Sequence, residues 1–135
     1  MKLLCNILFF SLVGALVLLG GLGIFTGAWE LQNVYQLPLA GMSRESRANL
    51  LNQYGYLKAL ELGFGLFSLL FRREIFTVPA FNRLFLAVVF AGVAARGLAI
   101  AANGWPHWSF IGITVFELAA GIVVALYSRS TLERS

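Results

Sequence analysis

Four ionisable residues stand inside long apolar runs, where a charge is costly. They are Lys58, Glu61, Arg96 and Glu117. A charged side chain at the centre of a membrane helix costs roughly 2.5–3.5 kcal/mol on insertion scales. Two cations and two carboxylates cancel in formal charge, so we expect these side chains to face inward and to pair. Intramembrane charges also mark ligand sites and proton pathways, which makes these four residues the candidate site.

Helical spacing places each charge on a stripe of polar or small residues. A rise of about 1.5 Å per residue puts Glu61, Arg96 and Glu117 about 10–12 Å below the outer ends of their helices, with Lys58 one turn higher. We therefore expect one shared charge layer, supported by Tyr54, Thr114 and Asn103. The stripes, at spacings of mostly three or four, are Ser11, Gly14 and Gly21; Tyr54, Lys58, Glu61, Gly65 and Ser68; Gly92, Arg96, Ala99 and Asn103; and Thr114, Glu117, Gly121 and Ser128.

Four apolar segments must position these charges. The chain has 135 residues, of which 59% are hydrophobic and only 12% charged, against about 25% charged in soluble domains. A span needs about 20 apolar residues, and four segments qualify: about 4–26, 53–71, 84–102 and 109–128. We predict an all-α, polytopic membrane protein, one domain over residues 1–135, folded as an antiparallel four-helix bundle. Ser43 resembles a helix N-cap, so the second helix should extend outward from about residue 43.

The basic residues indicate the orientation. With the N-terminus inside, only Arg44 and Arg47 lie outside, so the positive-inside rule places both termini in the cytoplasm. The basic residues assigned to the cytoplasmic side are Lys2, Arg72, Arg73, Arg83, Arg129 and Arg134. A cleaved signal peptide is disfavoured, because the first run is longer than usual and no A-x-A site follows it.

The connections carry signals of the membrane interface. Residues 72–83 are expected to form a short cytoplasmic link broken at Pro79, and residues 103–108 a tight outer turn that Gly104 starts. Aromatic residues of this kind gather at headgroup level. The predicted interfacial residues are Trp29, Trp105, His107 and Trp108.

Several kinds of chemistry are missing from the sequence. A single cysteine allows neither an internal disulfide nor a CxxC redox pair. With one histidine and no aspartate we expect no metal site, and we expect no catalytic residue and no resident cofactor. The net charge of +4 reflects the positive-inside bias and does not indicate nucleic-acid binding.

Four short motifs resemble those of domain-of-unknown-function family 4345 (DUF4345), a group similar to the DoxX-like four-helix bacterial membrane proteins. They are Tyr54–Gly55, Ala95–Arg96, Gly104–Trp105–Pro106 and Glu117. The resemblance covers nearly the whole chain and implies a multi-pass protein of the bacterial inner membrane. Lys58 and Glu61 are not part of the family pattern. Some DoxX-like proteins are small subunits of quinone-linked oxidoreductases, which implies an accessory role.

Two functions remain open at this stage. The first is a non-catalytic accessory or structural subunit of a larger complex or homo-oligomer, in which the charge layer fixes the bundle. The second is a protein that binds a lipophilic ligand, such as a lipid or quinone, or passes protons or small solutes through a polar pocket open to the outer side. An enzyme acting on lipids or quinones is a third class, disfavoured because no residue stands out as a nucleophile. The expected partners are membrane lipids and other membrane subunits or further copies of the chain.

Overall fold

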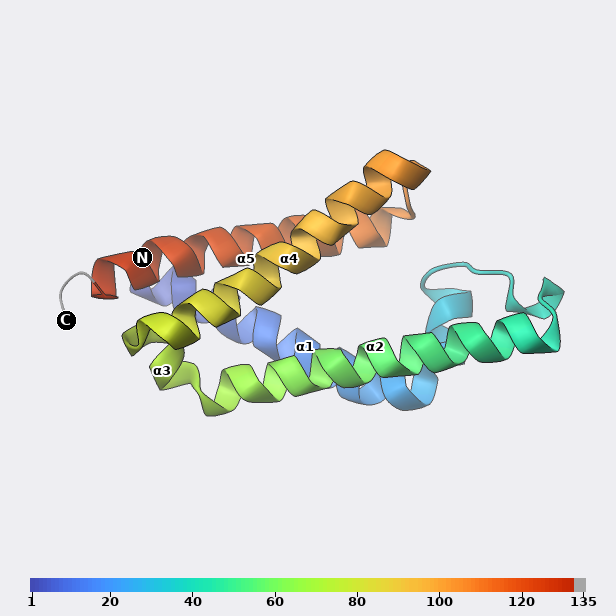
Figure 1. Cartoon of the computed structure of the whole chain (residues 1–135), viewed down its shortest axis with the longest axis horizontal. Coiled ribbons are helices and arrows are strands. Elements are labelled where there is room, and N and C mark those ends of the chain that lie inside the picture. The colour runs from blue at the N-terminus through green and yellow to red at the C-terminus, as the bar shows by residue number, and fades with distance from the viewer. Residues whose placement is uncertain (133–135) are drawn as a thin grey trace. The chain divides into compact units, whose positions relative to one another are not determined.

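The computed structural model describes residues 1–132, and every regular element in that range is helical (Figure 1). This confirms the all-α class for the described residues, and Arg134 lies outside them. Three of the helices, α1 (Lys2–Asn33), α4 (Pro79–Asn103) and α5 (Trp108–Leu132), are long and apolar enough to cross a membrane, which indicates a membrane-embedded protein. In chain order the elements are α1 (Lys2–Asn33), the 3-10 turn η1 (Leu39–Gly41), α2 (Arg44–Leu70), α3 (Arg72–Thr77), α4 (Pro79–Asn103) and α5 (Trp108–Leu132).

Two helix ends follow the local signals in the sequence. Ser43 is the N-cap of α2, as predicted: its Oγ accepts a hydrogen bond from the backbone N–H of Ser46 at 3.1 Å. Gly104 ends α4 with a φ of +88°, which favours glycine, and its N–H donates to the carbonyl of Ile100 at 2.9 Å. Helix length is therefore set here by side-chain capping at one end and by glycine at the other.

The link expected over residues 72–83 is helical on both sides of its break, which falls at Val78–Pro79. Residues Arg72–Thr77 form α3, and Pro79 begins α4 at a position where a missing N–H leaves no bond unmade. Only Val78 is extended, as expected for a residue before proline. The buried Asn82 amide donates to the carbonyl of Ile75 at 3.0 Å. Proline thus separates two helices instead of opening a loop, and Asn82 joins them.

The described chain forms two compact units. The first contains Met1–Leu12 and the chain from Ser68 onward. Within it α4 and α5 lie side by side and run antiparallel (Figure 1). The ring of Phe9 is fully buried, 5.2 Å from the ring of Phe76 and 5.5 Å from that of Phe85. This unit is therefore held by an aromatic core at the end where α1 begins.

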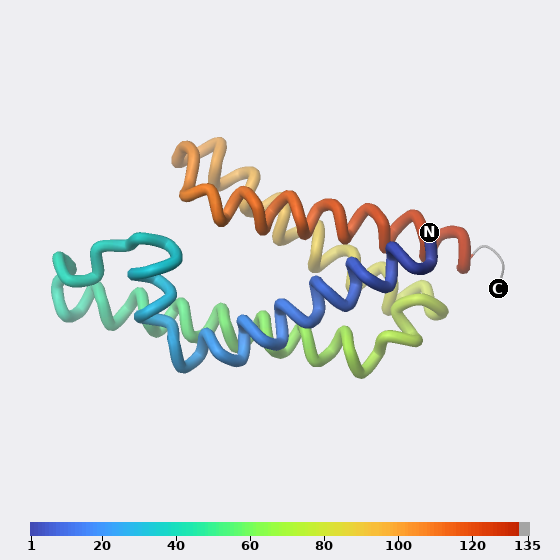
Figure 2. Tube along the Cα trace, turned by 180° about the vertical axis from the view of Figure 1, so that it is seen from behind, coloured from blue at the N-terminus to red at the C-terminus, as the bar shows by residue number. Residues whose placement is uncertain are grey.

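The second unit is Val13–Phe67, which pairs the later part of α1 with most of α2 (Figure 2). A Cβ on Gly20 would lie 2.6 Å from the backbone nitrogen of Leu62, and one on Gly65 would lie 3.0 Å from that of Val17. No side chain fits at such distances, so these glycines let the two backbones approach closely. The prediction of a single domain over residues 1–135 stays a prediction.

The glycine stripe predicted for the first helix is not the one that packs on α2. Gly14 has no neighbour within 4 Å of its Cβ position, and Gly21 meets only a Leu62 side chain, at 3.8 Å. The glycines that face α2 closely are Gly20, Gly23 and Gly27. Each of the two groups of glycines is spaced to lie on one helical face. Because α1 is apolar all round, this spacing alone could not show which of the two faces packs on α2.

Candidate functional site

Lys58 is the most buried charged residue among residues 1–132, with 4% of its surface exposed. Its Nζ donates a hydrogen bond to Oε2 of Glu61 at 3.0 Å, and lies 3.4 Å from Oε2 of Glu30. It also stands 5.2 Å from the centre of the Tyr54 ring. The ammonium group is thus placed between two carboxylates, one from α1 and one from its own helix.

Glu30 is the site residue that the sequence analysis missed. Its Oε1 accepts a hydrogen bond from the Thr26 hydroxyl at 2.9 Å, and its Oε2 accepts one from the Tyr54 hydroxyl at 2.5 Å. Together with the Lys58 contact, this gives the carboxylate three cationic or hydroxyl partners. The available signal was the spacing of Thr26 and Glu30, which places them one turn apart on a helix.

Glycines make the room that this cluster needs. A Cβ on Gly23 would lie 2.5 Å from Cδ of Lys58, and one on Gly27 would lie 3.0 Å from a ring carbon of Tyr54. The lysine stem and the tyrosine ring therefore lie directly on the bare backbone of α1. The glycines of α1 thus make room for the polar side chains of α2. We call the group of Glu30, Tyr54, Lys58 and Glu61 the Glu30–Lys58 cluster.

The Glu30–Lys58 cluster is not neutral. It holds two carboxylates and one ammonium group, so its formal charge is −1. The remaining donors are neutral hydroxyls, which stabilise a carboxylate without cancelling its charge. A charge-balanced interior was expected because Glu30 was not counted among the intramembrane charges.

The second pair of intramembrane charges joins α4 to α5. Nη2 of Arg96 donates to Oε1 of Glu117 at 3.3 Å, and the two side chains are 32% and 16% exposed. The other terminal nitrogen of Arg96, Nη1, is buried and has no hydrogen-bond partner in the structure. One donor of this guanidinium group is therefore available to an oxygen atom from elsewhere.

The predicted supporting residues have different roles. Tyr54 belongs to the Glu30–Lys58 cluster, whereas Thr114 and Asn103 bond carbonyls of their own helices, at 2.7 Å and 3.1 Å. The predicted interfacial tryptophans, Trp29, Trp105 and Trp108, are largely exposed. His107 contacts the Ser109 hydroxyl through Nδ1 at 2.9 Å.

The structure thus brings the four predicted charges together as two pairs. Lys58 and Glu61 belong to one unit, and Arg96 and Glu117 to the other, so a single layer of all four stays a prediction. Within residues 1–132 no three His, Cys, Asp or Glu side chains are grouped so that they could hold a metal ion. Arg96–Glu117 joins two helices, whereas Lys58–Glu61 lies within α2 and reaches α1 through the contact of Lys58 with Glu30.

Comparison with known proteins gives one match. The family model described as "Domain of unknown function (DUF4345)" matches residues 3–128, nearly the whole chain. No curated protein and no solved structure matches it. The functional argument therefore depends on the residues of this chain.

Proposed function

The chain belongs to the DUF4345 family, and from that premise we propose that it is a non-catalytic accessory or structural subunit of a larger membrane complex, or of a homo-oligomer. The main support is the pairing of its intramembrane charges. Lys58 is enclosed by two carboxylates, and Arg96 is bonded to Glu117. Pairing of this kind supports a structural role, in which the charges fix the register of the helices.

We further propose that α2 is a fourth span, which makes the protein an antiparallel four-helix bundle with both termini in the cytoplasm. By composition α2 is less apolar than the other long helices, since it carries Lys58 and Glu61 and a charged first turn. The ion pairs of Lys58 lower the cost of placing those charges in lipid. This is the DoxX-like arrangement, and the proposed location is the bacterial inner membrane.

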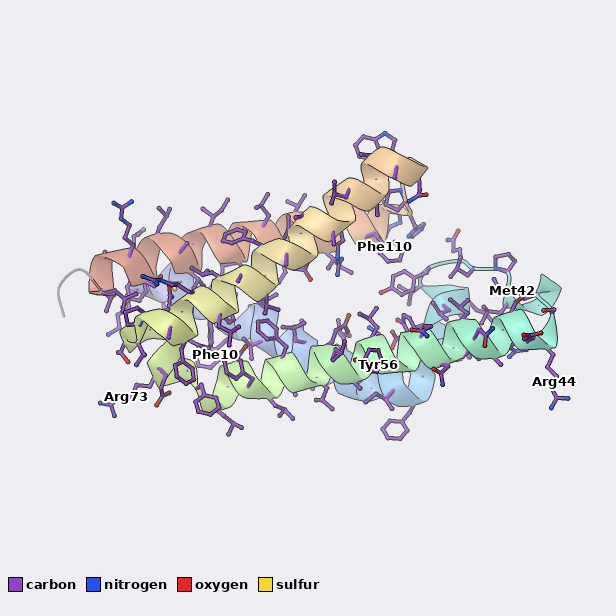
Figure 3. The ribbon with its side chains drawn as sticks, in the orientation of Figure 1. Phe10, Met42, Arg44, Tyr56, Arg73 and Phe110 are labelled. Atoms are coloured by element: carbon purple, nitrogen blue, oxygen red, sulfur yellow. The ribbon has the colours of Figure 1, made fainter. Side chains whose placement is uncertain are left out.

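The partner surface in this proposal is the apolar exterior of the long helices. Large apolar side chains project outward from α4 and α5 (Figure 3). On α4, Leu98 is 72% exposed. On α1, Phe25 is 88% exposed. Lipid tails are as apolar as these surfaces, so the hydrophobic effect does not favour a protein partner over lipid. Close packing against another subunit adds van der Waals contacts that lipid supplies less well.

Site-specific photocrosslinking in the native membrane tests this proposal. A photoreactive residue at Phe25 or Leu98 should give a discrete protein adduct, either a dimer of this chain or one larger partner. The same residue at Phe85, which is fully buried, is the matched control and should crosslink only within the chain. Lipid adducts alone at both exposed positions would contradict the subunit proposal.

A second candidate function rests on the free donor of Arg96. Its buried Nη1 could donate a hydrogen bond to a carbonyl oxygen of a quinone or to an oxygen of a lipid headgroup. The Arg96–Glu117 pair would then be part of a lipophilic-ligand site or a proton path. Glu117→Gln distinguishes the two functions. Under this candidate the variant keeps its fold but loses the lipid or quinone that mass spectrometry finds with the purified protein, or loses proton flux in vesicles. Under the subunit proposal the variant only loses stability, and its free energy of unfolding falls by about 1–3 kcal/mol.

A further inference from the structure

A groove of about 420 Å³ lies where the start of α1, the short helix α3 and the end of α5 meet, all within the first compact unit. Its volume is within the range of small-molecule sites, roughly 300–1,000 Å³. Lys2 and Asn6 line it from α1, Arg72 and Arg73 from α3, and Tyr127 from α5. The groove contains no member of either intramembrane ion pair, so its role does not depend on the proposed function.

Arg72 is held in place by neutral groups. Its Nη2 donates a hydrogen bond to Oδ1 of Asn6 at 3.3 Å, and its Cζ lies 4.5 Å from the centre of the Phe10 ring. An amide and an aromatic ring fix the direction of a guanidinium group without cancelling its charge. Since a guanidinium group has five N–H donors in a planar fork, Arg72 is an oriented cation with donors left for a second acceptor.

Two further donors of the groove are free within the described chain. Lys2 forms no ion pair or hydrogen bond with residues 1–132, and the hydroxyl of Tyr127 has no partner there either. The Tyr127 ring is held by an edge contact with Phe76, at 5.8 Å between ring centres. The described carboxylates of this unit are Glu74 and Glu117, and neither lines the groove. Two cations and a hydroxyl without a described carboxylate among them suit a phosphate group, which has several acceptor oxygens.

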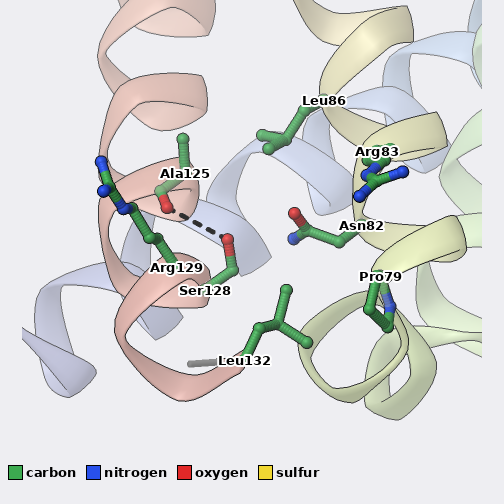
Figure 4. Close-up of a pocket in the computed structure, with 8 residues that line it drawn as sticks. All are labelled: Pro79, Asn82, Arg83, Leu86, Ala125, Ser128, Arg129 and Leu132. Carbon is green, nitrogen blue, oxygen red and sulfur yellow. Dashed lines mark hydrogen bonds between the residues drawn. The ribbon is translucent and has the colours of Figure 1, made fainter. Parts of the chain in front are cut away.

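A second basic groove of this unit, between α4 and α5, lacks these features (Figure 4). There Arg129 points away from the groove and has an interaction of its own. The buried polar side chains are already bonded, Ser128 to the carbonyl of Ala125 at 3.1 Å and Asn82 to that of Ile75 at 3.0 Å. Free donors therefore distinguish the groove at α3 from one that is merely near positive charge.

An exposed apolar face of α1 continues from the groove. Leu3, Ile7 and Phe10 share one helical face and are 74%, 54% and 43% exposed. Because Arg72 stacks on Phe10, the polar groove and this apolar face share a boundary. A ligand with an anionic head and an apolar tail fits both surfaces, whereas a free phosphate would use only the first.

We infer that this groove binds the phosphate of an anionic phospholipid. Arg72 donates its remaining N–H groups to the phosphate oxygens, Tyr127 donates its hydroxyl, and Lys2 adds a second cation. The acyl chains follow Leu3 and Ile7 along α1. Basic pockets between membrane helices at the cytoplasmic side are suited to such headgroups, and the proposed topology places this end of the helices there.

The test is native mass spectrometry of the full-length protein in detergent, titrated with phosphatidylglycerol or with phosphatidylcholine. Any affinity tag is placed at the C-terminus, because Lys2 is the second residue. Phosphatidylglycerol should bind at least about tenfold more tightly than phosphatidylcholine. R72Q should weaken phosphatidylglycerol binding by about tenfold, and K2Q and Y127F by about fivefold each. The measurement needs neither a partner subunit nor a defined orientation, so its failure would leave the proposed function untouched.

The matched control is R73Q, which removes the same charge from the next residue. Arg73 lines the groove, but its side chain extends outward from α3 (Figure 3), so R73Q should weaken binding by only about twofold. R72Q also removes the bond to Asn6 and could lower stability, whereas Lys2 has no bond to lose, so K2Q is the second variant. Equal losses in R72Q and R73Q would overturn the inference, because they would indicate surface charge alone. So would unchanged binding by K2Q, or displacement of the lipid by inorganic phosphate, which would show that the groove takes a free anion.

Discussion

Replacing Lys58 by methionine removes the one cation between Glu30 and Glu61 while keeping the length and the apolar stem of the side chain. The variant leaves two carboxylates at the α1–α2 contact without a counter-charge. Glu30 and Glu61 are only 13% and 23% exposed, so water reaches them poorly. We expect Lys58→Met to lower the free energy of unfolding more than substitution of any exposed charge.

The expected size follows from the two contacts. At an effective dielectric constant of about 20, charges separated by 3.0 Å and 3.4 Å attract by about 5 kcal/mol each. Desolvation of the three groups offsets much of this attraction, and removing one partner of a buried pair typically costs about 3–5 kcal/mol. That loss is a large fraction of the stability of a small domain, about 5–15 kcal/mol.

The assay is denaturant unfolding of the purified protein in detergent, followed by circular dichroism. The matched control is the neutral triple variant E30Q/K58M/E61Q, which removes all three charges and keeps the hydrogen-bond acceptors. It should recover most of the loss, since a buried ion pair contributes little relative to neutral residues of the same shape. The reasoning is refuted if Lys58→Met lies within about 1 kcal/mol of the natural sequence, or if the triple variant is no more stable than Lys58→Met.

Two further predictions concern helix packing and topology. Gly20→Ala should destabilise the protein by about 1–3 kcal/mol, because its Cβ would lie 2.6 Å from the backbone of the facing helix. The control Gly63→Ala, with open space around the new Cβ, should be neutral or stabilising by up to about 1 kcal/mol in the same assay. Equal effects of the two substitutions would show that α1 and α2 do not meet at Gly20. Cysteines at Ala40 and Thr77, in a background without the native cysteine, should be labelled by an impermeant maleimide from opposite sides of the membrane, and labelling of both from one side would contradict four spans.

Much of the helical architecture could be predicted from local signals. Ser43 marks the start of a helix because its hydroxyl caps a backbone N–H, and Gly104 marks the end of one because glycine adopts a positive φ. Both effects act over only a few residues. Pairing among the four intramembrane charges was expected because apolar surroundings leave a charge few partners, but the sequence did not show which charges pair: Lys58 with Glu61, and Arg96 with Glu117. Helix ends could therefore be predicted because they depend on local interactions, and charge pairing because few partners exist within the apolar segments.

The identity of the packed face could not be predicted. Any stripe of small residues at helical spacing can be the contact face, so the stripe at Gly14 and the stripe at Gly20 were equivalent until α2 was in place. Glu30 was missed for a related reason. It lies beyond the charge-free run, and only the position of Tyr54 and Lys58 shows that it takes part in the cluster.

The central claim is that the chain works as a subunit, with its charges committed to holding helices together. The most direct test is the mass of the particle extracted from its native membrane in mild detergent and measured by native mass spectrometry. The account predicts a mass well above the 14.8 kDa of one chain, corresponding to several copies or to a complex with other membrane subunits. A homogeneous particle of 14.8 kDa, with no partner protein recovered, would contradict it.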